Sequence, residues 1–219
     1  TYVLDPSNEA PCKIGCNHFT QGNLMDFETV YQFGKKVDVL TFEIEHVNVE
    51  ALEKLESEGV KVYPSSKTLK QIQNKGIQKE FYQQKNLPTA AFKKFDSLSE
   101  LETAINDQSV ALPFVWKSTC FGYDGNGVKI IRQIADLQNL PTGECITENL
   151  VPFKNELAVI VVRNPKGAIK TYPVVEMEFH PEANQVEYVI CPARIDDKIA
   201  EKARAIALKT SEAFEHVGL

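Results

Sequence analysis

The alternation of short apolar strands with helices over the first 65 residues most constrains the fold of this chain. The sequence predicts strands at residues 2–4, 38–44 and 61–63, and helices at residues 26–37 and 48–58. Consecutive parallel strands need a crossover connection, and a helix of about 10 to 15 residues supplies one. We therefore expect part of a doubly wound α/β domain with a parallel sheet at the N-terminal end.

A different pattern begins near residue 70. The sequence predicts helices at residues 66–86, 97–107 and 197–217, and strands at residues 89–95, 113–117, 128–131, 144–150, 157–163, 168–176 and 186–191. The last three strands follow one another without a helix between them, and Asn164-Pro165-Lys166-Gly167 is typical of a type I turn. This half is predicted to be α+β with an antiparallel sheet. We expect two domains, residues 1–70 and 71–219.

The composition excludes several classes of protein. Lysine and arginine total 24 against 30 aspartates and glutamates, so the net charge of −6 argues against nucleic-acid binding. No apolar run approaches the ~20 residues of a membrane-spanning helix. Five irregularly spaced cysteines argue against a disulfide framework and a structural zinc site, and favour a cytoplasmic protein.

One stretch of the chain is rich in lysine. Residues 61–94 contain eight lysines and a single acidic residue, Glu80. Solvated helix faces explain such a stretch, and the border of an anion-binding site is the alternative.

The strongest local signal for chemistry is Lys117, followed by the segment Gly122-Tyr123-Asp124-Gly125-Asn126-Gly127 and a strand beginning at Val128. A glycine-rich loop exposes backbone N–H groups that can bind phosphate oxygens, and Lys117 would place an ammonium group beside them. The segment lacks the pattern of a P-loop, and it precedes a strand where a dinucleotide-binding loop precedes a helix. A tight hairpin is the alternative interpretation.

Three further groups are candidates for binding. Glu148-Asn149-Leu150-Val151 can offer backbone groups to an adenine ring, and Glu156 can accept hydrogen bonds from ribose hydroxyls. Glu43 and Glu45 follow a predicted parallel strand, where ligands bind in such sheets. His180 is a lone histidine. An ordinary strand with a surface turn, a solvated strand exit and a structural histidine are the respective alternatives.

Several segments together resemble one family. They are Leu4-Asp5-Pro6, Asp38-Val-Leu-Thr-Phe-Glu-Ile-Glu-His-Val47, Gln78-Lys79, Leu87-Pro88-Thr89-Ala90, Lys117, Gly122-Tyr-Asp-Gly125 and Tyr172-Pro-Val-Val-Glu176. In this order the sequence resembles the N5-carboxyaminoimidazole ribonucleotide synthetases, ATP-grasp enzymes of purine biosynthesis. The resemblance covers nearly all 219 residues. The segment from Phe42 to Val47 argues against two sister ATP-grasp enzymes, formate-dependent glycinamide ribonucleotide transformylase and biotin carboxylase.

The resemblance implies a reaction and its participants. ATP with Mg²⁺ would phosphorylate bicarbonate to carboxyphosphate, and the amine of 5-aminoimidazole ribonucleotide would then be carboxylated. The implied site residues are Lys75 and Lys117 at the phosphates, Gly122 to Val128 over them, Glu148 to Val151 at the adenine, Glu156 at the ribose, His180 at the nucleotide pocket, and Glu43, Glu45 and Tyr123 at the ribonucleotide. A homodimer is also implied.

This chain departs from the family pattern in two places and lacks others. Asn126 stands where the family usually has Lys or Arg, and Lys75 stands where it usually has Arg. Lysine is a point charge, whereas arginine offers a planar fork of donors. The family's Gly-rich first strand would precede Thr1, and its Asn-Glu metal-binding pair would follow Leu219. We therefore expect the chain to be truncated at both ends and inactive alone, and a non-catalytic nucleotide-binding module is a further alternative.

Overall fold

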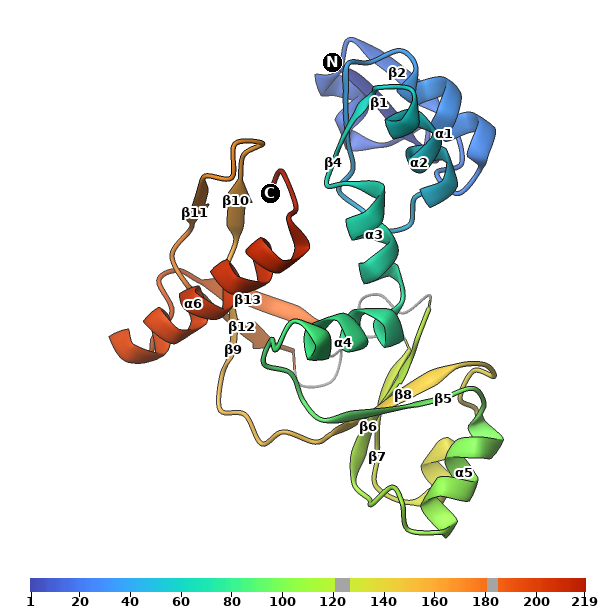
Figure 1. Cartoon of the computed structure of the whole chain (residues 1–219), viewed down its shortest axis with the longest axis vertical. Helices are drawn as coiled ribbons and strands as arrows, with labels where there is room; N and C mark the ends of the chain where they lie inside the picture. Colours follow the sequence, from blue (N-terminus) through green and yellow to red (C-terminus); the bar gives the residue numbers. More distant parts are fainter. Residues whose placement is uncertain (121–126, 181–184) are drawn as a thin grey trace. The chain divides into compact units, whose positions relative to one another are not determined.

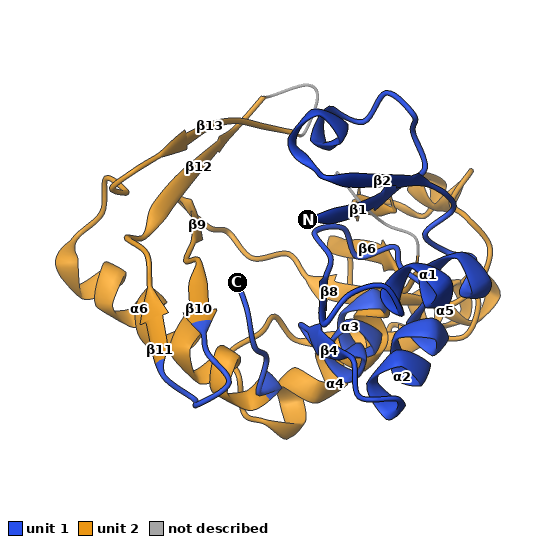
Figure 2. Ribbon diagram, turned by 90° about the horizontal axis from the view of Figure 1, so that it is seen from above, with its two compact units in different colours: residues 1–73, 163–168, 214–219 blue, residues 74–162, 169–213 orange. Residues whose placement is uncertain are grey.

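The computed structural model describes residues 1–120, 127–180 and 185–219, and these form two compact units (Figures 1 and 2). The first unit contains Thr1–Gln73 together with the short segments Arg163–Ala168 and Phe214–Leu219. The second unit contains Asn74–Val162 and Ile169–Ala213. None of the helices in these described ranges is long and apolar enough to cross a membrane.

The first unit is built from parallel strands and helices, as the sequence predicts. Its elements are β1 (Tyr2–Asp5), a 3₁₀ helix (Pro11–Gly15), β2 (His18–Gln21), α1 (Phe27–Gly34), β3 (Val39–Thr41), α2 (Val49–Ser57), β4 (Lys61–Tyr63) and α3 (Ser66–Gln73). Strand β1 pairs in parallel with β2, and β3 pairs in parallel with β4. The strand β2 was not predicted, because His18-Phe19-Thr20-Gln21 lacks a clear apolar alternation.

The strand predicted at residues 38–44 is shorter than expected. It ends at Thr41, and the chain then leaves the sheet. The carbonyl oxygens of Glu45 and Val47 accept hydrogen bonds from the Gln73 side-chain amide at 2.6 and 3.0 Å. A distant side chain therefore satisfies backbone carbonyl groups in the loop that follows the strand.

The core of the first unit packs α1 closely against α2. Leu52 and Leu55 of α2 are fully buried, and a Cβ atom added to Gly34 of α1 would lie 2.2 Å from Leu55 Cδ1. Gly34→Ala is expected to lower the free energy of unfolding by about 1–3 kcal/mol, because the added methyl group overpacks the core. Urea unfolding measures the loss. Gly15→Ala is the control, since no atom lies within 4 Å of its added Cβ, and equal stability of both variants would contradict the prediction.

The second unit contains three small sheets and three α-helices in its described part. Its elements are α4 (Lys75–Gln84), β5 (Phe92–Phe95), α5 (Leu98–Asn106), β6 (Phe114–Ser118), β7 (Val128–Ile131), a 3₁₀ helix (Ile134–Leu137), β8 (Cys145–Asn149), β9 (Glu156–Ala158), β10 (Val161–Arg163), β11 (Ile169–Thr171), β12 (Val175–Phe179), β13 (Val186–Ile190) and α6 (Asp197–Phe214). The sheet orders are β5-β8-β6-β7, β13-β12-β9 and β10-β11. The pairs in the first two sheets are antiparallel, which confirms the predicted antiparallel character.

The two long strands predicted near the middle of this unit are each divided. The predicted strand at residues 157–163 forms β9 and β10, and the one at 168–176 forms β11 and the start of β12. The turn between β10 and β11 is closed as expected, since Gly167 N donates to Asn164 O at 2.9 Å. Each half of a divided strand joins a different sheet.

The four-stranded sheet has two different faces. One face packs against α5 through an apolar core that includes Phe95, Leu101, Phe114, Trp116 and Ile131. Along each strand the intervening side chains point to the opposite face, because side chains alternate across a strand. Helix α4 contacts this sheet through β8. The face beside α4 therefore carries the polar side chains described next.

Candidate functional site

Two predicted site residues, Lys117 and Glu148, lie on the same face of the four-stranded sheet. Glu148 of β8 is directly opposite Val115 of β6, and Lys117 follows Val115 by two residues. Residues two apart on a strand share a face, so Lys117 and Glu148 are diagonal neighbours within reach of long side chains. The pairing of β6 with β8 therefore places the ammonium beside the carboxylate.

Glu148 binds two lysines from different elements. Lys117 Nζ lies 2.9 Å from Glu148 Oε2, and Lys79 Nζ of α4 lies 2.9 Å from Glu148 Oε1. The side chains of Glu148 and Lys79 are only 9% and 11% exposed, while that of Lys117 is 27% exposed. Buried charges are tolerated when they are paired with opposite charges, and each oxygen of Glu148 has an ion-pair partner.

The cluster carries a net positive charge. Burial alone would raise the pKa of Glu148, but the hydrogen bonds from Lys79 and Lys117 outweigh it and lower the pKa below its usual value. Glu148 is therefore ionised at neutral pH. Two ammonium groups and one carboxylate leave one positive charge at this face, which suits an anionic ligand.

The first turn of α4 is held against the chain that follows β6. Lys75 N donates to Thr119 O at 2.8 Å, and Asn74 caps the helix by accepting from Ile77 N at 3.0 Å. A Cβ on Gly76 would lie 3.1 Å from Asn74 Oδ1 and 3.1 Å from Lys94 Cε, so a small residue suits this position. The predicted site residue Lys75 is therefore held beside the residues that follow Lys117.

The glycine-rich segment is described only at its end. The predicted residues Gly122, Tyr123, Asp124, Gly125 and Asn126 lie outside the described residues. Gly127 O accepts from Ser118 N at 2.9 Å, and Val128 pairs with Lys117 across β6 and β7. The backbone on both sides of the segment is therefore fixed by the sheet that carries Lys117.

The other predicted nucleotide residues follow β8 or belong to the three-stranded sheet. Asn149 ends β8, and Leu150 and Val151 follow it, with Val151 exposed. Glu156 begins β9 and pairs with Met177 of β12. His180 directly follows β12 and donates its backbone N–H to Gln185 O.

The predicted ribonucleotide residues Glu43 and Glu45 lie in the first unit. Both are exposed, in the loop between β3 and α2. They follow the carboxyl end of the parallel strand β3, as the sequence predicts. Among residues 1–120, 127–180 and 185–219, no group of three or more His, Cys, Asp or Glu side chains could hold a metal ion. The described residues therefore provide no ligand cluster for Mg²⁺.

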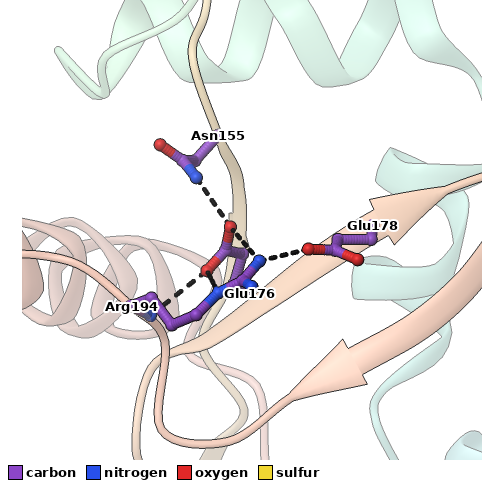
Figure 3. Close-up of polar contacts among 4 residues, drawn as sticks. All are labelled: Asn155, Glu176, Glu178 and Arg194. Atoms are coloured by element: carbon purple, nitrogen blue, oxygen red, sulfur yellow. Dashed lines mark hydrogen bonds and ion pairs between the residues drawn. The ribbon is translucent and has the colours of Figure 1, made fainter.

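A second polar cluster, which the sequence did not reveal, surrounds Glu176 of β12 (Figure 3). Arg194 donates from Nε and Nη2 to the two Glu176 oxygens, each at 3.1 Å, and Asn155 Nδ2 donates at 2.7 Å. Arg194 also donates its backbone N–H to Glu176 and pairs with the carboxylate of Glu178. Eighteen positions separate Glu176 from Arg194, so no local motif signals the pair. The cluster fastens the loop after β13 to β12.

This cluster predicts a pH dependence of stability. The Arg194 hydrogen bonds outweigh the opposing effect of burial and, with Asn155, lower the pKa of Glu176 to about 2. The unfolded carboxyl has a pKa of roughly 4.3. The stabilisation is therefore complete above the unfolded pKa and is lost as the pH falls through the folded pKa. Urea titrations between about pH 5 and 2 should show a smaller loss of stability for Glu176→Gln than for wild type. Glu187→Gln, at an exposed site on β13, should keep the wild-type slope, and equal slopes for all three proteins would contradict the prediction.

The comparisons with known proteins agree with this architecture. The ATP-grasp domain family matches residues 80–219. The chain belongs to the ATP-grasp family. The ribonucleotide synthetase preATP-grasp domain matches residues 1–73, ahead of the ATP-grasp match. The predicted combination of an α/β N-terminal domain and an ATP-grasp domain is thereby confirmed.

Individual relatives of this ATP-grasp protein are N5-carboxyaminoimidazole ribonucleotide synthetases. The enzyme of Synechocystis sp. is 35% identical, over 99% of this chain and 54% of its own length. The crystal structure of the Thermotoga maritima synthetase is 37% identical, with a TM-score of 0.85 over 99% of this chain and 55% of that one. The Aspergillus clavatus synthase, solved with ADP and 5-aminoimidazole ribonucleotide, is 31% identical, with a TM-score of 0.83 over 99% and 56%. These findings confirm the predicted resemblance, and the chain spans about half the length of these relatives.

Proposed function

We propose that the protein acts in the ATP-dependent carboxylation of 5-aminoimidazole ribonucleotide, a step of purine biosynthesis. The ion pair between Glu148 and Lys117, which lies in the strand that precedes the glycine-rich segment in sequence, is the observation that carries the proposal. Lys117 supplies a cation just before a glycine-rich segment of the kind that binds phosphate groups. The likeness to a synthase solved with ADP and 5-aminoimidazole ribonucleotide supports the choice of substrates.

The proposed reaction has two steps. The γ-phosphoryl group of ATP passes to bicarbonate and gives carboxyphosphate and ADP. The amine of the ribonucleotide then forms a C–N bond with the carboxyl carbon, and phosphate leaves. Lys117 would hold phosphate oxygens and lower the cost of the charge that develops on them. Mg²⁺ would supply further neutralisation of the phosphates, although no described residue is assigned to hold it.

Each predicted site residue has a proposed role. The phosphate group comprises Lys75, Lys117 and the segment from Gly122 to Val128; the adenine group comprises Glu148, Asn149, Leu150 and Val151; Glu156 would bind the ribose; His180 would border the nucleotide pocket; and Glu43, Glu45 and Tyr123 would bind the ribonucleotide. Asn126 cannot provide the positive charge usual in the family. The proposed division into domains at residue 70 is supported by family matches of which the first ends at residue 73 and the second begins at residue 80.

ADP release tests the proposal. The full-length gene product is incubated with Mg-ATP and bicarbonate, with and without 5-aminoimidazole ribonucleotide. Release that depends on the ribonucleotide supports the carboxylation. If ATP binds but release does not depend on the ribonucleotide, the substrate assignment is wrong, and glycinamide ribonucleotide with formate, or biotin, is tested next. Residues 1–219 alone are expected to bind nucleotide without turnover, since they span about half the length of the relatives that they match.

The proposal extends to assembly and location. We expect a homodimer in the cytoplasm, supported by the resemblance and by the five free thiols. Light scattering measures the mass in solution.

A further inference from the structure

Lys79 is a buried cation to which the proposed reaction assigns no role. It is buried and lies in α4, on the polar face of the four-stranded sheet. Besides its ion pair with Glu148, its ammonium donates to Thr89 Oγ1 and lies 5.9 Å from the centre of the Phe92 ring. These contacts come from β5 and from the loop that precedes it. Lys79 is therefore fixed in place from several sides.

Lys117 is held less firmly than Lys79. Its side chain is more than twice as exposed as that of Lys79, at 27% against 11%. It also lies in the strand that leads into the glycine-rich segment. Of the two cations on Glu148, Lys117 is thus the one that can turn toward a ligand at a small cost in packing.

The carboxylate makes such a movement costly unless another cation remains. A buried carboxylate that loses its only counter-ion is strongly destabilised. Glu148 has two, one on each oxygen, and the contact with Lys79 does not depend on Lys117. We propose that Lys79 is a positioning residue, the permanent counter-ion of Glu148, which leaves Lys117 free to exchange Glu148 for a nucleotide phosphate oxygen. This inference rests on the proposed function only in that the site binds a nucleotide.

The exchange predicts coupling between Lys79 and Glu148. Without Lys79, Lys117 becomes the only counter-ion of the buried carboxylate, and a phosphate must compete with Glu148 for it. Without the charge of Glu148, Lys117 is released whether or not Lys79 is present. Lys79 therefore influences the nucleotide only when Glu148 is a carboxylate.

A double-mutant cycle in the full-length protein tests this coupling. The dissociation constant of ADP is measured by calorimetry for wild type, Lys79→Met, Glu148→Gln and the double variant. Lys79→Met should weaken ADP binding by about tenfold in the wild-type background, the size of one charge-assisted contact, and by no more than about twofold in the Glu148→Gln background. In turnover, Lys79→Met should raise the KM for ATP more than it lowers kcat. Lys70→Met, in α3 of the first unit, removes an exposed ion pair with Glu53; it is the control and should keep wild-type binding.

Every outcome decides the proposal. Unchanged ADP binding in Lys79→Met would overturn it, and an equal loss in both backgrounds would also do so by showing that Lys79 acts independently of Glu148. If Lys79→Met does not fold, the comparison of Glu148→Gln with the double variant remains, and a loss above about twofold there overturns the proposal. ADP binding by wild type without ribonucleotide-dependent turnover defeats the proposed substrate but leaves the cycle intact. No ADP binding by wild type defeats both.

Discussion

Replacement of Lys117 by methionine is expected to lower the rate of ATP-dependent ADP release by about 10²–10³-fold, the usual effect of removing one preorganised donor to developing charge. Methionine keeps most of the length of the side chain and removes its ammonium. Glu148 retains its ion pair with Lys79 at 2.9 Å, so the fold should survive. Steady-state ADP release by the full-length protein measures the loss, and thermal unfolding reports whether the variant is folded.

A matched control shows whether the effect depends on where the lysine lies or on the loss of any lysine charge from this sheet. Lys129 of β7 lies opposite Trp116 on the other face of the same sheet, and its ammonium donates to Asp136 O at 2.6 Å. Lys129→Met should leave ADP release within about twofold of wild type, since it lies away from Glu148. A folded Lys117→Met protein with wild-type turnover would exclude Lys117 from the phosphate site.

Glu148→Ala is expected to have the largest effect on stability, a loss of about 3–5 kcal/mol in the free energy of unfolding. The substitution leaves the ammonium groups of Lys79 and Lys117 facing each other without the carboxylate that joins them. Guanidinium unfolding measures the loss. Glu144→Ala, at an exposed position just before β8, is the control and should cost less than about 0.5 kcal/mol. If Glu148→Ala lowers the free energy of unfolding by less than about 1 kcal/mol, the prediction is wrong, and water replaces the carboxylate between the two lysines.

The fold was predictable from the sequence wherever local signals agreed with tertiary contacts. The cap at Asn48 and the turn at Asn164 have the hydrogen bonds that their residue types predict. The strand predicted to reach Ile44 ends at Thr41, and in the loop beyond it the Glu45 carbonyl oxygen accepts from the Gln73 side chain, twenty-eight positions away. Such distant partners cannot be read from a local pattern.

The candidate site was predictable only in part for the same reason. Lys117 and Glu148 were identified from a glycine-rich segment and a strand end, and their side chains meet in the sheet. Lys79 was only one of eight lysines between residues 61 and 94. Helical periodicity identifies apolar faces, but it does not show which lysine side chains are buried. Lys79 differs from the solvated lysines only through its contact with the buried carboxylate of Glu148. The Glu176–Arg194 pair escaped detection because its partners come from separate strands and loops.

The division into units has a consequence for how the chain can be cut. Its path leaves or re-enters the first unit at four peptide junctions, after Gln73, Val162, Ala168 and Ala213. A polypeptide ending at Gln73 would therefore lack two short pieces of its own unit, and one beginning at Asn74 would carry those pieces without their companions. Cutting the gene after residue 73 would therefore yield an incomplete first unit and a second unit that carries two extra pieces, even though each family match is continuous in sequence.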